Sequence, residues 1–243
     1  MKKNIAIALT LLSAVCAQAQ EKKYPEPEGM RPGMTEFWTP QRKVVTPGDI
    51  KTNSAPSDAI VLFDGKNLDA WHNGNGGPAE WIVKNGVVTV DKTKGDIVTR
   101  KNFGSFQLHL EWCVPADING EGQGRGNSGV FLQDKYEVQI LDCYKNETYI
   151  NGMTGSIYKQ TPPQVNAMRK PGEWNVYDII YTAPVFKEDG TYLYRPRVTV
   201  IHNGVVLQNN TEILGTTEWT LSNGVRVIIK PTDFKQDEIL FYA

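Results

Sequence analysis

The sequence has few of the residues that bind metals or form disulfide frameworks, and it lacks an excess of either charge. Its 243 residues include three cysteines and three histidines, and 26 basic residues stand against 27 acidic ones. The charges are spread along the chain, so no basic patch favours nucleic acid or an anionic membrane surface as a partner. No apolar run reaches the roughly 20 residues that a transmembrane helix needs. These absences argue against a nucleic-acid-binding module and against a membrane span.

The N-terminal segment has the pattern of a signal peptide. Two lysines precede an apolar run at residues 5–15, and residues 17–19 fit the small-x-small cleavage rule. We expect cleavage before Gln20 and export to the periplasm or the cell exterior. The mature chain would then carry 24 basic and 27 acidic residues. Lipid anchoring at Cys16 is the alternative, and the residue before it is bulkier than lipoproteins usually have there.

Two cysteines remain after the signal peptide, Cys113 and Cys143. Export permits a disulfide between them, but two separate, partly buried thiols fit the sequence equally well. No spacing typical of metal ligands is present.

Residues 20–57 are predicted to form an irregular arm. Six of the 14 prolines of the chain lie between residues 24 and 57, and proline disfavours both helices and central strands. Phe37 and Trp38 are the expected docking points of the arm on the following domain. A disordered linker is the alternative, although two adjacent aromatics speak against it.

Residues 58–243 have the pattern of an all-β domain. Turn dipeptides tolerant of positive φ angles recur through it, at 64–65, 85–86, 189–190, 203–204 and 223–224. Short β-prone runs lie between them, and no stretch shows a helical period over ten residues. Many short strands with loops of varied length predict a two-sheet sandwich, and specifically a jelly roll.

Two predicted strands place polar side chains on one face and apolar side chains on the other. Within residues 106–112, His109 and Glu111 alternate with apolar residues, and Glu137 and Gln139 do so within residues 136–140. If the two polar faces adjoin, they form a groove of the kind that binds carbohydrate. Solvated outer faces of a sheet explain the same alternation.

Further candidates surround the second of these strands. Glu137 and Asp142 are five residues apart, a separation that places them on one side only if a β-bulge intervenes. A glycosidase using these two as its carboxylate pair is one interpretation of this spacing. The preceding glycine-rich segment, residues 120–129, lacks the helix and the Lys-Ser/Thr pair of a phosphate loop. A loop beside the groove fits better, with Arg125 and Asn127 able to meet sugar hydroxyls.

Six short motifs in order resemble one known family. They are Leu62–Trp71 (LFDGKNLDAW), Gly126–Leu132 (GNSGVFL), Tyr136–Asp142 (YEVQILD), Ser156–Tyr158 (SIY), Pro171–Asn175 (PGEWN) and His202–Gly204 (HNG). Together they resemble the 3-keto-α-glucoside 1,2-lyase/3-keto-2-hydroxy-glucal hydratase family, also called 3-keto-disaccharide hydrolases. The resemblance runs from about residue 58 to 218, and it implies a concanavalin-like jelly roll and a carbohydrate substrate.

The chemistry implied by the resemblance begins with a ketone at C3 of the sugar, which acidifies the hydrogen on C2. A base removes that proton, the C1 substituent leaves by elimination, and water adds to the resulting glucal. Such a site needs a base, an acid, and donors or a cation for the enolate oxygen, a divalent metal being one option for the cation. We expect Glu137 as the base and Asp142 or His109 as the acid. The expected substrate-binding residues are Glu111, Arg125, Asn127, Gln139, Tyr158 and Trp174.

The C-terminal segment departs from the family pattern from about residue 220. Family members close with histidine-containing motifs, whereas this chain has no histidine after His202. A non-catalytic carbohydrate-binding member of the family is therefore an alternative to an active enzyme.

Overall fold

The computed structural model describes residues 29, 31–34, 36, 40–49, 51–52 and 54–213, together with the strands at 217–220 and 226–229. The chain divides into two compact units, Met1–Val61 and Leu62–Ala243. The predicted signal peptide, the alternative lipid anchor at Cys16, and the docking residues Phe37 and Trp38 lie outside the described residues. Most of the divergent C-terminal segment does so too.

The described part of Met1–Val61 contains one short 3₁₀ helix, η1 (Pro32–Met34), and no strand. Its clearest local structure is a closed loop between Thr46 and Ser57. The Ser57 N–H donates to the Thr46 carbonyl and the Thr46 N–H donates to the Ser57 hydroxyl, both over 3.0 Å. Two reciprocal hydrogen bonds therefore tie the ends of this loop together.

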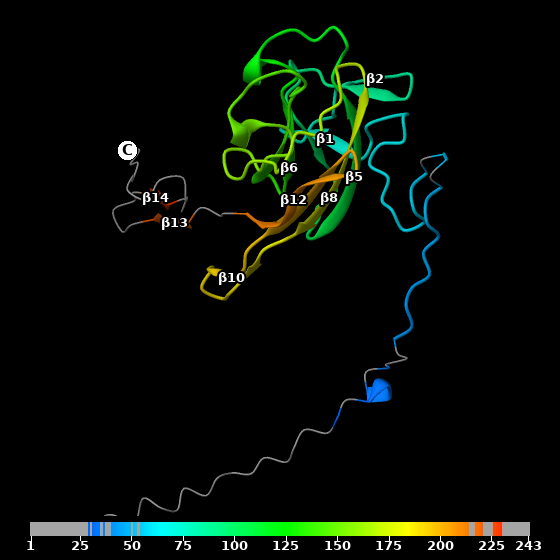
Figure 1. Ribbon diagram of the computed structural model, residues 1–243, viewed down its shortest axis with the longest axis vertical. Helices are drawn as coiled ribbons and strands as arrows, with labels where there is room; N and C mark the ends of the chain where they lie inside the picture. Colours follow the sequence, from blue (N-terminus) through cyan, green and yellow to red (C-terminus); the bar gives the residue numbers. More distant parts are fainter. Residues whose placement is uncertain are drawn as a thin grey trace, which may run out of the picture. The chain divides into compact units, whose positions relative to one another are not determined.

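The largest sheet of the second unit has four antiparallel strands. They are β5 (Phe106–Cys113), β8 (Trp174–Thr182), β11 (Arg197–His202) and β12 (Val205–Glu212), in the order β12-β11-β8-β5. Figure 1 shows β5, β8 and β12 running side by side in this sheet. β5 and β8 pair without a break along all eight residues of β5. This regularly paired sheet forms the first layer of the unit.

The second layer is built on β6 (Ser128–Leu132) and β7 (Tyr136–Ile140), which pair in a regular antiparallel register. Residues 155–158 lengthen this layer, because Ile157 forms a bridge with Val138 on the free edge of β7. The smaller sheets pair β1 (Trp71–Asn73) with β4 (Ile97–Thr99), β2 (Ile82–Lys84) with β3 (Val87–Thr89), β9 (Val185–Phe186) with β10 (Tyr192–Tyr194), and β13 (Thr217–Thr220) with β14 (Arg226–Ile229). Two further 3₁₀ helices are η2 (Gly122–Gly124) and η3 (Ile150–Gly152).

One apolar core lies between the two layers. Alternate residues of β5 and β7 enter it, including Leu110, Trp112, Val138 and Ile140, as the sequence pattern predicted. Tyr177 of β8 also enters the core and is fully buried, and its hydroxyl donates to the Gln139 carbonyl across 2.7 Å. This hydrogen bond joins the large sheet to the back of β7.

The predicted turns have the expected backbone geometry. Asn203 and Gly204, between β11 and β12, have φ angles of 52° and 80°. Positive values at both positions are the signature of the tight turns that match the twist of a hairpin. The fold is an all-β sandwich of the jelly-roll type, so this prediction is confirmed, and the described residues contain no α-helix.

Candidate active site

The outer face of the β6–β7 layer carries the most organised polar cluster. Glu137 and Gln139 point away from the core because Val138 and Ile140, their neighbours along β7, point into it. The Tyr158 N–H donates to the Glu137 carbonyl over 2.9 Å, which makes the two residues cross-strand neighbours on the same face. We call the surface formed by Gly129, Phe131, Glu137, Gln139 and Tyr158 the Glu137 face.

A glycine forms the floor beneath the Glu137 carboxyl group. A Cβ atom added at Gly129 would lie 2.1 Å from Glu137 Oε1, which is far inside van der Waals contact. The carboxyl group therefore lies directly over the backbone of β6. Phe131 of β6 pairs with Glu137 in the register, so the two side chains lie beside each other on the same face. Phe131 is 54% exposed.

An amide holds the carboxyl group from one side. Gln139 is fully buried, and turning its amide so that the nitrogen faces Glu137 lets it donate to Glu137 Oε1 and to the Ser128 carbonyl, both over 3.0 Å. The opposite orientation points the amide oxygen at those two acceptors and donates to Gln123 Oε1 instead. The first orientation is favoured, because it replaces two oxygen–oxygen contacts with two hydrogen bonds, and it leaves one such contact, between the Gln139 amide oxygen and Gln123 Oε1 at 3.1 Å.

Gln123, which the sequence analysis did not single out, lies against the Gln139 amide from the glycine-rich segment. Its amide nitrogen donates to the Thr148 hydroxyl over 2.8 Å and to the Gly152 carbonyl over 2.9 Å. Asn127 lies beside it and donates to the Gln123 carbonyl over 2.9 Å. The structure thus brings the predicted residues Glu137, Gln139, Asn127 and Tyr158 together.

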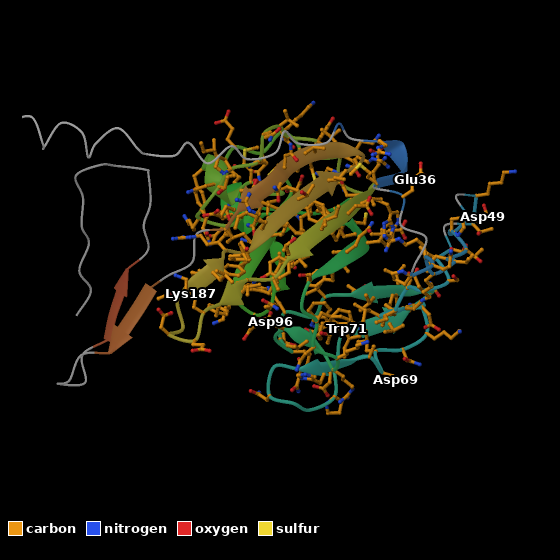
Figure 2. The ribbon with its side chains drawn as sticks, turned by 90° about the horizontal axis from the view of Figure 1, so that it is seen from below. Glu36, Asp49, Asp69, Trp71, Asp96 and Lys187 are labelled. Atoms are coloured by element: carbon orange, nitrogen blue, oxygen red, sulfur yellow. The ribbon has the colours of Figure 1, made fainter. Side chains whose placement is uncertain are left out.

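The surroundings of Glu137 raise the pKa of its carboxyl group. Burial raises the pKa of Glu137 above its ordinary value, and the negative charge of Asp96 raises it further. Asp96 immediately precedes β4, in the small sheet that also contains Trp71 (Figure 2). A carboxyl group with a raised pKa is a stronger base once it is ionised, which suits it to remove a proton from carbon.

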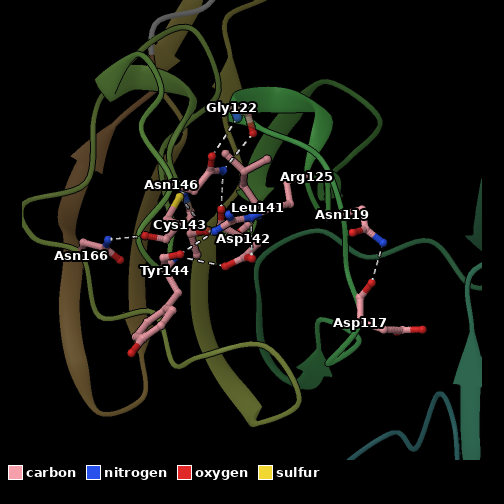
Figure 3. A network of polar contacts seen from close by, with 11 residues as sticks. Asp117, Asn119, Gly122, Arg125, Leu141, Asp142, Cys143, Tyr144, Asn146 and Asn166 are labelled. Carbon is pink, nitrogen blue, oxygen red and sulfur yellow. Dashed lines mark hydrogen bonds and ion pairs between the residues drawn. The ribbon is translucent and has the colours of Figure 1, made fainter.

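Asp142 and Arg125 form a buried ion pair beyond the end of β7 (Figure 3). Arg125 Nε lies 2.8 Å from Asp142 Oδ2, the Asp142 side chain is fully buried, and Asp142 Oδ1 accepts from the Tyr144 N–H over 3.0 Å. Asn146 joins the same network by donating to the carbonyls of Asp142 and Gly122. The network fastens the glycine-rich segment to the residues that follow β7.

This arrangement corrects two expectations from the sequence. The β6–β7 register is regular and β7 ends at Ile140, so the bulge that would align Asp142 with Glu137 is absent. With its charge paired to Arg125 and no surface exposed, Asp142 is not placed to protonate a bound sugar. Arg125 likewise directs its guanidinium group to Asp142 and the Tyr144 carbonyl.

The remaining predicted residues lie on the other side of the sandwich. His109 and Glu111 on β5, and Trp174 on β8, are exposed residues of the large sheet, on the strand face opposite to the core. His109 Nδ1 contacts Asp178 Oδ1 across 2.8 Å, and both side chains are more than a third exposed. Because β5 and β7 direct their inner residues into one core from opposite layers, their polar faces do not adjoin. Of the two alternatives that the sequence left open, a groove between these faces is therefore not formed.

A family model for the 3-keto-alpha-glucoside-1,2-lyase-like domain matches residues 58–234. The chain belongs to this family. The match covers both layers of the sandwich and the whole Glu137 face. Every site residue predicted from the sequence lies within it.

Two known proteins are similar to this lyase-like domain. A 3-keto-disaccharide hydrolase of Bacteroides thetaiotaomicron is 25% identical over 207 residues, which are 68% of this chain and 61% of that protein. The chain thus spans less than two thirds of the length of the curated relative. A crystal structure of a candidate glycosyl hydrolase from Parabacteroides distasonis is 65% identical, with a TM-score of 0.74, and the match covers 79% of this chain and 83% of that one.

His202 of the family motif has a structural position in this lyase-like domain. It is fully buried, stacks on Trp112 with 5.6 Å between ring centroids, and its Nε2 lies 3.0 Å from Asn175 Oδ1. Burial lowers the pKa of His202 to about 4, with a smaller contribution from Arg169, so the imidazole is neutral at neutral pH. The motif therefore marks the core, away from the Glu137 face.

The two cysteines in the described part of the chain do not form a disulfide. Cys113 and Cys143 are free thiols, which selects the second of the two alternatives left open by the sequence. Among the described residues, no group of three or more His, Cys, Asp or Glu side chains is close enough to share a metal ion. No helix of the described part of the chain is long and apolar enough to cross a membrane.

Proposed function

We propose that the Leu62–Ala243 unit cleaves 3-keto-glycosides on the Glu137 face, with Glu137 as the base. The observation that carries the proposal is the placement of this carboxyl group. It is partly buried, lies over Gly129, is held by Gln139, and has a raised pKa. The family match and the name of the Bacteroides relative support a 3-keto sugar as the substrate.

The proposed reaction begins with the transfer of the C2 proton to Glu137. The electron pair of the C2–H bond moves into the C2–C3 bond, and the electron pair of the C3 carbonyl moves onto its oxygen to form an enolate. When the enolate collapses, a C1–C2 double bond forms and the C1–O bond breaks. The departing oxygen takes a proton from water at this open face.

Hydration completes the cycle. Water adds to the 3-keto-2-hydroxy-glucal. Its hydroxyl group bonds to C1, its other proton neutralises the hydroxide left by the elimination, and the proton on Glu137 returns to C2. The net change is hydrolysis of the glycoside to a free 3-keto sugar and an alcohol. Microscopic reversibility lets the same carboxyl group serve both half-reactions.

An ordinary glycosidase is the second candidate, and one observation favours it. Such an enzyme needs two carboxyl groups that flank the scissile bond. Asp142 is buried in its ion pair, but Asp96 is close enough for its charge to raise the pKa of Glu137. Glu137 and Asp96 are therefore the pair that a glycosidase reaction would use.

The substrate separates the two candidates. The purified protein is incubated in parallel with a 3-keto-glucoside and with the corresponding native glucoside, and products are followed by mass spectrometry. We expect 3-keto-glucose and the glucal intermediate from the first substrate and no product from the second. Glu137→Gln should slow the reaction by about 1,000-fold. Cleavage of the native glucoside would instead establish the glycosidase, and binding of the sugar without turnover would identify a non-catalytic carbohydrate-binding protein.

A further inference from the structure

Two tyrosine hydroxyl groups meet beside the Glu137 face. Tyr149 immediately precedes η3, and Tyr158 ends the segment 155–158. Their hydroxyl oxygens are 2.6 Å apart and their ring centroids are 6.3 Å apart. Each phenol has a single O–H to donate. One of the two protons is used within the pair, so the other is left for a third oxygen atom.

The pair lies beside the proposed base, on the same face of the layer. Tyr158 is the cross-strand neighbour of Glu137, through the hydrogen bond from its N–H to the Glu137 carbonyl. The Glu137 charge also acts on the Tyr158 phenol. A phenol, with an ordinary pKa of about 10, is protonated at neutral pH, as a hydrogen-bond donor must be.

The backbone around the pair is shaped to hold it. A Cβ atom at Gly152 would lie 2.0 Å from the Tyr149 ring, so only glycine leaves room for the ring in this position. Lys159 has a φ angle of 58°, a conformation that is uncommon for a residue with a side chain. Its N–H donates to the Asn151 carbonyl over 2.9 Å, and its ammonium group lies 3.4 Å from the centroid of the Tyr149 ring.

We propose that the Tyr149–Tyr158 hydroxyl pair, with the Lys159 charge beside it, hydrogen-bonds the C3 oxygen of the sugar as that oxygen becomes an enolate. The inference rests on the proposed function, because it assigns the donor that the enolate requires. No proton is transferred from Tyr158 to the C3 oxygen. Tyr158 donates to the carbonyl oxygen throughout, and the bond strengthens as negative charge collects there. Tyr149, donating to Tyr158, polarises that hydroxyl group further.

The test uses a sugar that can form the enolate but has no group to eliminate. In 3-keto-1,5-anhydroglucitol, C1 carries no leaving group, so base catalysis exchanges the C2 hydrogen for deuterium without cleavage. Exchange in D₂O is followed by proton NMR, and the hydrogen on C4, which also adjoins the ketone, reports the uncatalysed background. We expect the wild-type protein to accelerate exchange at C2 and to leave C4 near background.

Replacing the hydroxyl groups should slow this exchange. For Tyr158→Phe we expect a loss of about 100-fold in kcat with a small change in KM, the effect of removing one donor to an oxyanion. Tyr149→Phe should lose less, because Tyr158 keeps its own proton. Gly152→Ala, which displaces the Tyr149 ring, should resemble Tyr149→Phe. Tyr194→Phe, an exposed tyrosine on β10, is the control and should match the wild type.

The outcomes separate this inference from the proposed function. If Tyr158→Phe exchanges C2 as fast as the wild type but eliminates the aglycone of a 3-keto-glucoside slowly, the hydroxyl pair acts on the leaving oxygen and the inference is overturned. It is also overturned if Tyr158→Phe matches the wild type in both assays while Glu137→Gln is inactive. If the wild type neither exchanges C2 nor cleaves a 3-keto-glucoside, the proposed function itself fails. Thermal unfolding of each variant verifies that it is folded.

Discussion

The two outer faces of the sandwich have similar sequence patterns and different structures. On the large sheet, His109 Nδ1 contacts Asp178 Oδ1, and the two side chains are 51% and 37% exposed. On the other layer, Gln139 is fully buried and Glu137 is partly buried, because the glycine-rich segment and residues 155–158 surround them. Alternation along a strand specifies which side chains leave the core. The loops decide whether those side chains meet water or an organised site.

The largest contrast should come from matched substitutions on the two faces. Glu137→Gln is expected to lower kcat/KM on a 3-keto-glucoside by about 1,000-fold, as loss of a general base does. Glu111→Gln removes the same charge from the large sheet and should remain within about twofold of the wild type. If Glu111→Gln lowers kcat/KM more than Glu137→Gln does, the site does not lie on the Glu137 face.

The buried ion pair at the end of β7 should matter for stability. Asp142→Asn leaves the Arg125 guanidinium group without its charge partner, so the free energy of unfolding should fall by about 3 kcal/mol in chemical denaturation. The fraction that remains folded should keep its activity on a 3-keto-glucoside. A stable but inactive Asp142→Asn protein would restore Asp142 as a catalytic acid.

The glycine floor offers a subtler way to disturb the Glu137 face. Gly129→Ala places a methyl group where Glu137 Oε1 lies, so the carboxyl group must move by about 1 Å and kcat should fall by about 100-fold. Gly124→Ala is the control, since its Cβ would meet nothing within 4 Å. Wild-type kinetics for Gly129→Ala would show that the position of the carboxyl group is not critical.

The pH profile tests the electrostatics of the same face. Asp96→Asn removes the negative charge that raises the pKa of Glu137, so that pKa should fall. A base acts in its ionised form, and the acidic limb of kcat/KM should therefore move to lower pH. Asp178→Asn removes a charge from the opposite face and should leave the limb in place. If Glu137 instead acted in its protonated form, its pKa would control the basic limb, and Asp96→Asn would move that limb to lower pH.

The smallest effect is expected on the exposed face. A double-mutant cycle with His109→Gln and Asp178→Asn should give a coupling free energy below about 1 kcal/mol, because both groups are in contact with water. Measured by urea unfolding, a coupling as large as the loss in Asp142→Asn would remove the distinction between the two faces.

The sequence was sufficient for the local geometry of the sandwich. The alternation of Leu110 with Glu111 and of Val138 with Glu137 predicted the inner residues, and Asn203-Gly204 predicted a hairpin turn. These features depend on neighbours in the chain, and a period of two or a dipeptide is enough to reveal them.

The site was only partly predictable, because it depends on contacts between distant segments. Gln123, Tyr149 and Gly152 lie in or beside short 3₁₀ helices whose sequences have no strand or helix period. Their partners are identified only when residues 155–158 pair with β7. The burial of Asp142 follows from where β7 ends, a boundary that residue types do not define. Similar polar patterns on β5 and β7 could not reveal which of them would be covered.

The hydrogen bond from Tyr177 to the Gln139 carbonyl has a consequence for engineering the specificity of this domain. It anchors β7 from behind, at a residue that touches the Glu137 carboxyl group, to a side chain fully enclosed by the core. The strand that carries the base is therefore a fixed wall, and redesigning it would disturb the whole sandwich. Libraries aimed at new sugars or aglycones should instead vary exposed positions in the segments around η2 and η3, and leave Gln123, Tyr149 and Gly152 unchanged.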